Sequence, residues 1–139
     1  MRPPSPGLNA LAAFFTFGAL ASGTSCVTLL FSGTPLDAVW RLNPRGHDAL
    51  HSLGAWGVGL MAAVCVACAL AARGIWIRAP WGYRLALTIV VVNVVADTLN
   101  AVALGDRRTL IGIPIGGALI GYLLSPRVRT AFRIAEAAA

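Results

Sequence analysis

The sequence predicts an all-α integral membrane protein, a four-transmembrane-helix bundle followed by a short C-terminal amphipathic helix at the membrane interface. Composition is the first reason: 58% of the 139 residues are hydrophobic and 12% are charged, which is too little polar surface for a soluble domain of this size. The second reason is that the apolar residues fall into four runs separated by short polar segments. The third is that all eleven basic residues are arginines, and they cluster at the ends of these runs.

We expect a single membrane domain over residues 1–139, with spans over about 8–31, 49–72, 84–104 and 110–124 and an interfacial tail over 126–139. The fourth run is shorter than the ~20 residues of a bilayer crossing, so it must borrow length from its flanks or thin the bilayer locally. Asn43 and Pro44, before the second span, have the pattern of a helix start. An alternative for the N-terminus is a signal peptide, residues 1–21, cleaved after Ala21.

The distribution of arginines predicts the orientation. Four spans put both termini on one side of the membrane, and seven arginines then fall on that side against four on the other. The positive-inside rule makes that side cytoplasmic, so we expect an inner-membrane protein with both termini in the cytoplasm. We attribute the sequence pI of about 10.6 to contact with anionic lipid headgroups of the bilayer and not to nucleic-acid binding.

The third span carries polar side chains along one helical stripe. Asn93, Asp97 and Asn100 are spaced i, i+4 and i+7, so they share a face of an otherwise apolar helix. An ionised Asp inside hydrocarbon costs roughly 2.5 to 3.5 kcal/mol, so this face should meet protein or a wet cavity. Counting residues from the span ends puts His51 and Ser25 at a similar depth. We therefore expect these five residues to form an outward-facing polar pocket.

Several functions fit such a pocket. It could bind a proton, a cation or a small polar or amphipathic ligand, in transport or in an accessory subunit of a larger complex. Alternatively, Asp97 and His51 could act as general acid and base in an intramembrane enzyme with a lipid-like substrate. In a third interpretation Asp97 only fixes helix register through hydrogen bonds, and the protein is a structural subunit.

The chain offers weaker signals for metal and redox chemistry. His47, Asp48 and His51 are close enough in sequence to suggest a metal site, although a His pair at a helix end often only contacts water and headgroups. Cys65 and Cys68 have the spacing of a redox pair but lie within an apolar run with no basic neighbour, so we expect them to be packing residues. No motif in the sequence predicts a bound cofactor.

Glycines in the fourth run form two small-residue pairs, Gly112 with Gly116 and Gly117 with Gly121. Such pairs let two helix backbones approach closely in a membrane. They predict either packing within the bundle or a contact with a second copy of the chain in a homo-oligomer.

Overall fold

The computed structural model describes residues 6–104 and 111–137, and all its regular elements are helical. In chain order they are α1 (Pro6–Leu30), the 3-10 helix η1 (Pro35–Leu42), α2 (Pro44–Ser52), α3 (Ala55–Trp76), α4 (Pro80–Leu104), α5 (Gly112–Leu124) and α6 (Pro126–Ala137). Among the described residues, Pro6–Leu30, Ala55–Trp76 and Pro80–Ala103 are long and apolar enough to cross a membrane, and Gly112–Leu124 is a shorter apolar helix. The chain is thus a multi-pass helical membrane protein, as its composition predicts. Residue 110, where the fourth span was expected to begin, lies outside the described residues.

The second span differs from its predicted bounds. The sequence predicts one helix over 49–72, whereas the chain forms α2, breaks at Gly54 and begins α3 at Ala55. Gly54 has a φ of 55°, in the left-handed region where glycine is favoured. A side chain at Gly57 would overlap the backbone carbonyl of Leu50, so this glycine lets α2 fold back closely on α3. As a result His51 lies on α2, ahead of the membrane-crossing helix.

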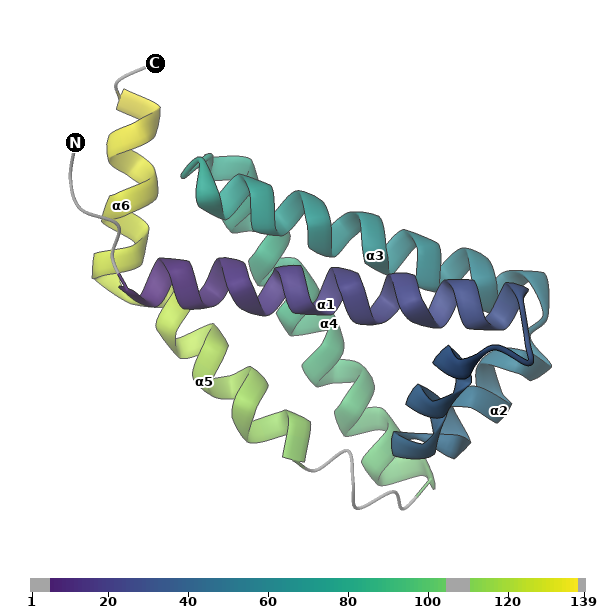
Figure 1. The fold of residues 1–139 in the computed structure, drawn as a ribbon. Helices are drawn as coiled ribbons and strands as arrows, with labels where there is room; N and C mark the ends of the chain where they lie inside the picture. The colour runs from purple at the N-terminus through teal and green to yellow at the C-terminus, as the bar shows by residue number, and fades with distance from the viewer. Residues whose placement is uncertain (1–5, 105–110, 138–139) are drawn as a thin grey trace.

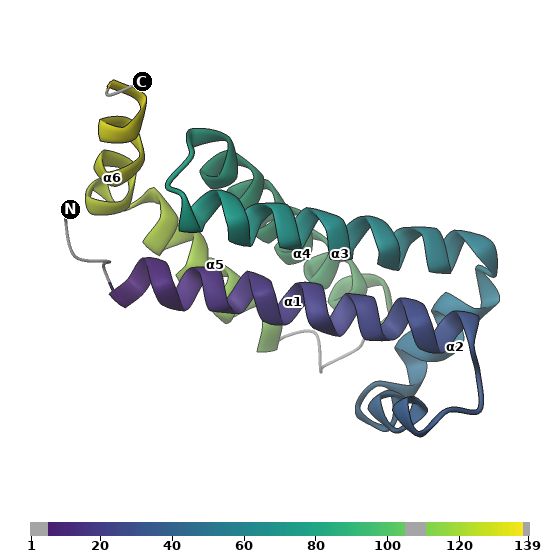
Figure 2. The same cartoon turned by 45° about the horizontal axis from the view of Figure 1, so that its top comes forward.

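Helices α1 and α3 form the most extensive pairing in the bundle, and they lie side by side and antiparallel in both views (Figures 1 and 2). Small residues line the contact: side chains at Gly18 and Gly23 would meet the sulfur atoms of Cys68 and Cys65. Further along, the Cys26 thiol points at the carbonyl oxygen of Val58, with an Sγ to O distance of 3.8 Å. The three cysteines are free thiols, and their contacts agree with the packing role expected for Cys65 and Cys68.

Helix α4 packs most closely on α3 near the point where the two are joined. Gly74 near the end of α3 and Gly82 near the start of α4 touch through their backbones, which leaves no room for a Cβ at either position. This contact explains why α3 continues through Arg73 and Gly74 to Trp76, past its predicted end. Helix α5 then packs antiparallel to α4, with Gly116 against Val94 and Val90.

Helix α6 is amphipathic as predicted, but its apolar side faces the protein. Val128 and Phe132 are both 3% exposed, and the ring of Phe132 lies 5.3 Å from that of Tyr83 in α4, measured between centroids. In Figure 1 α6 points away from the bundle, across the direction of α1. The apolar side of α6 thus covers α4 and α5, whereas Arg127 and Arg129 on α6 are exposed. That α6 lies at the membrane interface stays a prediction.

Buried side chains gather at one end of the bundle, which we call the closed end: the start of α1, the end of α3, the start of α4 and the end of α5. Phe15, Ile75 and Leu123 are its largest fully buried apolar side chains. The rest of this core is Leu8, Leu11, Ala12, Cys68, Ala71, Ala86, Val90, Val128 and Phe132. At the opposite end, which we call the open end, the buried residues among those described are Thr28 and Gly57. The helices are thus held together mainly at one end.

The two glycine pairs of α5 have different surroundings. A side chain at Gly112 or Gly116 would overlap α4, whereas Gly117 and Gly121 have no described atom within 4 Å of an added Cβ. Packing inside the bundle therefore accounts for the first pair only. The second pair faces outward.

We predict that Gly116→Leu destabilises the fold by about 1–3 kcal/mol, because the new side chain must displace Val94 from a packed contact. Its neighbour provides the matched control: Gly117→Leu should change stability by less than about 0.5 kcal/mol, since that position is open. The measurement is the free energy of unfolding in detergent. Equal losses in the two variants would show that α5 is oriented differently. Light scattering on Gly117→Leu, compared with the native chain, reports whether the outward pair mediates self-association.

Candidate functional site

Asp97 lies in a small cavity between α4 and α5, toward the open end. The cavity has a volume of about 210 Å³ and is lined by Val90, Asn93, Val94 and Asp97 of α4, Gly112, Ile115, Gly116 and Leu119 of α5, and Phe14 of α1. Its walls are mainly apolar, and Asp97 is the one ionisable side chain among these residues. The sequence predicts the polar stripe of α4, and the structure supplies the helix that it faces.

Two short sequence patterns build this cavity. Asn93 and Asp97 are one helical turn apart on α4, and Gly112 and Gly116 are one turn apart on α5, so each pair lies on a single face. The Asp97 carboxylate occupies the space that a Cβ at Gly112 would fill. Glycine is thus required at position 112 to admit the carboxylate. Asp97 is half-buried, and Asn93 is exposed.

The Asp97 carboxylate receives no hydrogen bond from residues 6–104 or 111–137. Placing a lone charged carboxylate between apolar helix faces is costly, so it requires a proton, a counter-ion or water. In the structural interpretation of the sequence, Asp97 is either protonated or hydrogen-bonded to Asn93, Asn100 and a Ser/Thr patch; the described residues show no such hydrogen bond, and the protonated form stays untested. Neither Asn bonds to it here.

The other residues expected in the pocket lie elsewhere. The described lining of the Asp97 cavity includes Asn93 but not Asn100, His51 or Ser25. Asn100 is exposed one turn beyond Asp97, and His51 is exposed on α2 because of the break at Gly54. Ser25 is half-buried on α1, which pairs with α3 along its length. Matching residue counts along different helices did not predict which of these side chains meet.

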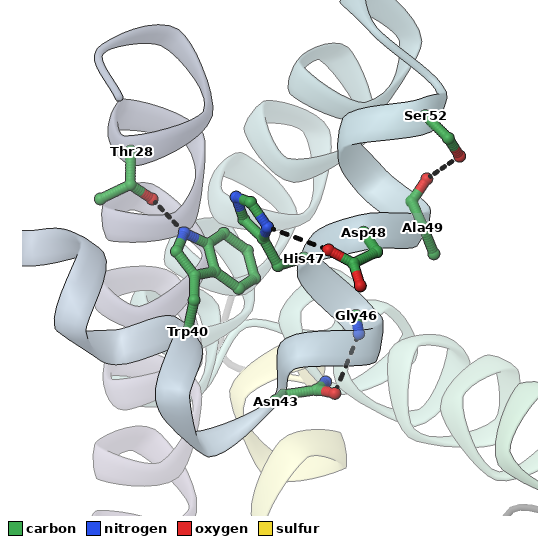
Figure 3. A network of polar contacts seen from close by, with 8 residues as sticks. All are labelled: Thr28, Trp40, Asn43, Gly46, His47, Asp48, Ala49 and Ser52. Atoms are coloured by element: carbon green, nitrogen blue, oxygen red, sulfur yellow. Dashed lines mark hydrogen bonds and ion pairs between the residues drawn. The ribbon is translucent and has the colours of Figure 1, made fainter. Parts of the chain in front are cut away.

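A second polar group, which we call the Trp40 cluster, forms at the open end from Thr28, Trp40, His47, Asp48 and His51 (Figure 3 shows all but His51). The indole Nε1 of Trp40 donates a hydrogen bond of 3.0 Å to the Thr28 hydroxyl. That hydroxyl, on a residue only 1% exposed, in turn donates to the backbone carbonyls of Thr24 and Ser25, each at 3.0 Å. Sequence analysis missed Thr28. The sequence feature that could have indicated it is a Thr near the end of an apolar run, 12 residues before a Trp.

The imidazole rings extend this cluster along α2. The ring centroid of His47 lies 4.9 Å from that of Trp40 and 5.7 Å from that of His51. His47 Nδ1 is 3.5 Å from a carboxylate oxygen of Asp48, an ion pair when the histidine is protonated. The three rings form a row that joins the end of α1 to the start of the second crossing.

Local sequence signals position the cluster. The Asn43 side chain accepts a 3.0 Å hydrogen bond from the Gly46 amide and Pro44 opens the first turn of α2, which confirms the predicted helix start. Before η1, the Asp37 carboxylate accepts a 2.6 Å hydrogen bond from the Gly33 amide. These two caps hold η1 and α2 against the end of α1, so Trp40 reaches Thr28.

The metal hypothesis receives no support from the arrangement of the described side chains. Within residues 6–104 and 111–137, no three His, Cys, Asp or Glu side chains come together as a ligand set. His47, Asp48 and His51 therefore do not form a three-ligand set.

Comparison with protein families, with curated proteins and with solved structures finds no match. The fold defines the class: a small multi-pass helical membrane protein in contact with the lipid bilayer. Any more specific assignment depends on the two polar groups described above.

We predict a direct energetic coupling between Thr28 and Trp40. In a double-mutant cycle of Thr28→Val and Trp40→Phe, the coupling energy should be about 0.5–1.5 kcal/mol, the usual net contribution of a hydrogen bond. The measurement is the free energy of unfolding of the single and double variants. Trp76→Phe serves as the control partner because Trp76 is 80% exposed, and it should combine additively with Thr28→Val. An additive Thr28/Trp40 cycle would mean that the indole is not bound there.

Proposed function

We propose that the chain crosses the inner membrane four times, with both termini in the cytoplasm, and that the Asp97 cavity is an outward-facing site for a proton or a small cation. The start of α1 and the start of α6 line one cavity at the closed end, which supports an even number of crossings. Helix α5 has 13 residues and a length of ~20 Å at ~1.5 Å per residue, so its crossing requires a locally thinned bilayer. The surplus of arginines at the closed end supports a cytoplasmic location for that end.

The observation that carries this proposal is the Asp97 carboxylate, set against the Gly112 backbone with no hydrogen bond from a described residue. Such a group has an oxygen available to a proton or a small cation. The cavity of about 210 Å³ holds roughly seven waters at ~30 Å³ each, enough for a partly hydrated ion. It is smaller than the ~300–1,000 Å³ typical of sites for drug-sized ligands.

A protein that binds a proton or a cation at this site could transport it, or could be an accessory subunit of a larger complex. Ion flux through the purified protein in liposomes distinguishes these two functions. A small amphipathic ligand is the second candidate. It is favoured by a neighbouring cavity that shares Phe14 and Leu119 with the Asp97 cavity, so the apolar chain of the ligand could extend from one cavity into the other.

The enzyme hypothesis needs His51 beside Asp97, and His51 is not among the residues described in the cavity wall. It stays an alternative, tested by His51→Ala.

A homo-oligomer remains a proposal for the outward face of α5. Gly117 and Gly121 are exposed and contact nothing within the described chain, so they offer a flat surface to a second copy. Gly112 and Gly116 no longer belong to this proposal, because α4 covers them.

We predict that Asp97→Asn abolishes ion binding and leaves the fold intact. The amide keeps the shape of the carboxyl and removes its proton and its charge, so the stability change should be about 1 kcal/mol or less. Infrared titration of the native protein should show a protonated carboxyl band that is absent in the variant. In liposomes, the variant should also lose any pH-driven flux that the native protein shows.

Asp48→Asn is the control, since Asp48 is exposed on α2, and it should retain both signals. If Asp97→Asn keeps the band and the flux, the ion is bound elsewhere. If Asp97→Asn is silent in every assay while Asp97→Leu unfolds the bundle, Asp97 serves only to hold the helices in register.

We predict that Pro35→Cys reacts with a membrane-impermeant maleimide in intact cells, and that Pro80→Cys reacts only after permeabilisation. Pro35 opens η1 at the open end and Pro80 opens α4 at the closed end, so the two variants report opposite faces. Both should be made in a background in which Cys26, Cys65 and Cys68 are replaced by Ser or Ala. The reverse labelling pattern would invert the orientation and place Asp97 toward the cytoplasm.

A further inference from the structure

Two adjoining cavities lie toward the closed end, outside the proposed ion site at Asp97. The larger, about 710 Å³, is lined by residues of α1, α5 and α6, among them Ser125 and Arg127. The second, about 350 Å³, lies between α1 and α5 and is lined by Ala10, Leu11, Phe14 and Leu119. Both are bordered by Gly7 and Tyr122, and the Tyr122 hydroxyl fills the space that a side chain at Gly7 would need. The two cavities therefore adjoin at Gly7 and Tyr122, and we call them together the groove: the larger is partly polar and the smaller is mainly apolar.

From these cavities we infer that the groove binds one anionic phospholipid of the adjacent leaflet, its phosphate beside Arg127 and one acyl chain between α1 and α5. From Ser125 to Leu119 along α5 is six residues, or ~9 Å at ~1.5 Å per residue, so the groove covers the headgroup end and the first part of one acyl chain within a ~15 Å leaflet. At its far end the groove reaches Phe14 and Leu119, which also line the Asp97 cavity.

Charge complementarity selects the headgroup. Arg73, Arg78, Arg84, Arg127 and Arg129 all lie at the closed end, whereas the acidic side chains that the structure describes, Asp37, Asp48 and Asp97, lie toward the open end. Arg127 is the arginine in the wall of the groove, and the Ser125 hydroxyl beside it offers a donor to a phosphate oxygen. An anionic headgroup is therefore favoured over a zwitterionic one at this end.

The apolar part of the groove favours a lipid chain over a helix of another protein. Helices α1 and α5 meet near Gly7 and Tyr122 and separate toward the open end, where Phe14 is 45% exposed. The space between them is a slot of about 350 Å³ with mainly apolar walls, which suits a hydrocarbon chain. An acyl chain there would also seal the Asp97 cavity on the side of the closed end.

The test is native mass spectrometry of the full-length protein in detergent with phosphatidylglycerol or phosphatidylcholine of identical acyl chains. The native protein should bind phosphatidylglycerol about fivefold more tightly, the preference that one arginine near a lipid surface supplies. Arg127→Gln should remove this preference, and Arg127→Lys should retain most of it. Arg129→Gln is the matched control on the same helix, outside the groove wall, and should behave like the native protein.

A second variant tests the chain-binding part. Ala10 is an exposed position of α1 in the groove wall, so Ala10→Phe should fold normally and weaken the binding of both lipids. Equal affinity of the native protein for the two lipids would overturn the inference. So would equal losses in Arg127→Gln and Arg129→Gln, which indicate only a diffuse basic surface, or unchanged binding by Ala10→Phe. None of these variants alters the Asp97 cavity, so this result is independent of the ion-binding test.

Discussion

The core at the closed end is the constraint on which the rest of the structure depends. Inside a bilayer the lipid tails are as apolar as the helix faces, so helices associate through close packing and not through exclusion of water. Phe15, Ile75 and Leu123 supply that packing, and the backbone contact of Gly74 with Gly82 brings α4 against α3. Among residues 6–104 and 111–137, no comparable set of buried side chains draws α1, α4 and α5 together at the other end. The open end is where a polar side chain can remain within the span of the membrane.

Much of the fold follows from the sequence because the bilayer limits the secondary structures that an apolar segment can adopt. Long apolar runs must be helices, since every backbone group needs an internal partner, and the prolines at 44, 80 and 126 each open a helix close to where the apolar pattern changes. The break at Gly54 was not predicted. A glycine inside an apolar run is compatible with a continuous helix, and only the packing of Gly57 on Leu50 decides for a turn. The inward face of α6 also needed the tertiary structure, because an amphipathic pattern does not distinguish lipid from protein.

The sequence predicts the residues of the candidate site only in part, because it does not show how the helices cross. The stripe of Asn93 and Asp97 and the pair of Gly112 and Gly116 are both visible in the sequence, but their meeting is a property of how α4 crosses α5. The expected grouping with His51 and Ser25 assumed upright helices and equal depth from residue counts. The break after α2 places His51 ahead of the membrane-crossing helix, and Ser25 lies on α1, which pairs with α3. Thr28 was missed because a single Thr in an apolar helix usually bonds to its own backbone, as it also does here.

The small residues of α5 link the two proposed sites, the Asp97 cavity and the slot between α1 and α5. Glycines on α5 play opposite roles a turn apart: Gly112 admits the Asp97 carboxylate and Gly116 brings α4 close enough to form the cavity wall. Replacing either by a larger residue would separate α5 from α4, and the same movement would change the slot between α5 and α1. The proposed ion site at Asp97 and the proposed lipid site in the slot therefore share one short helix, α5. Helix α5 contacts α4 through Gly112 and Gly116 and contacts α6 beyond its other end, so its position depends on both of these contacts.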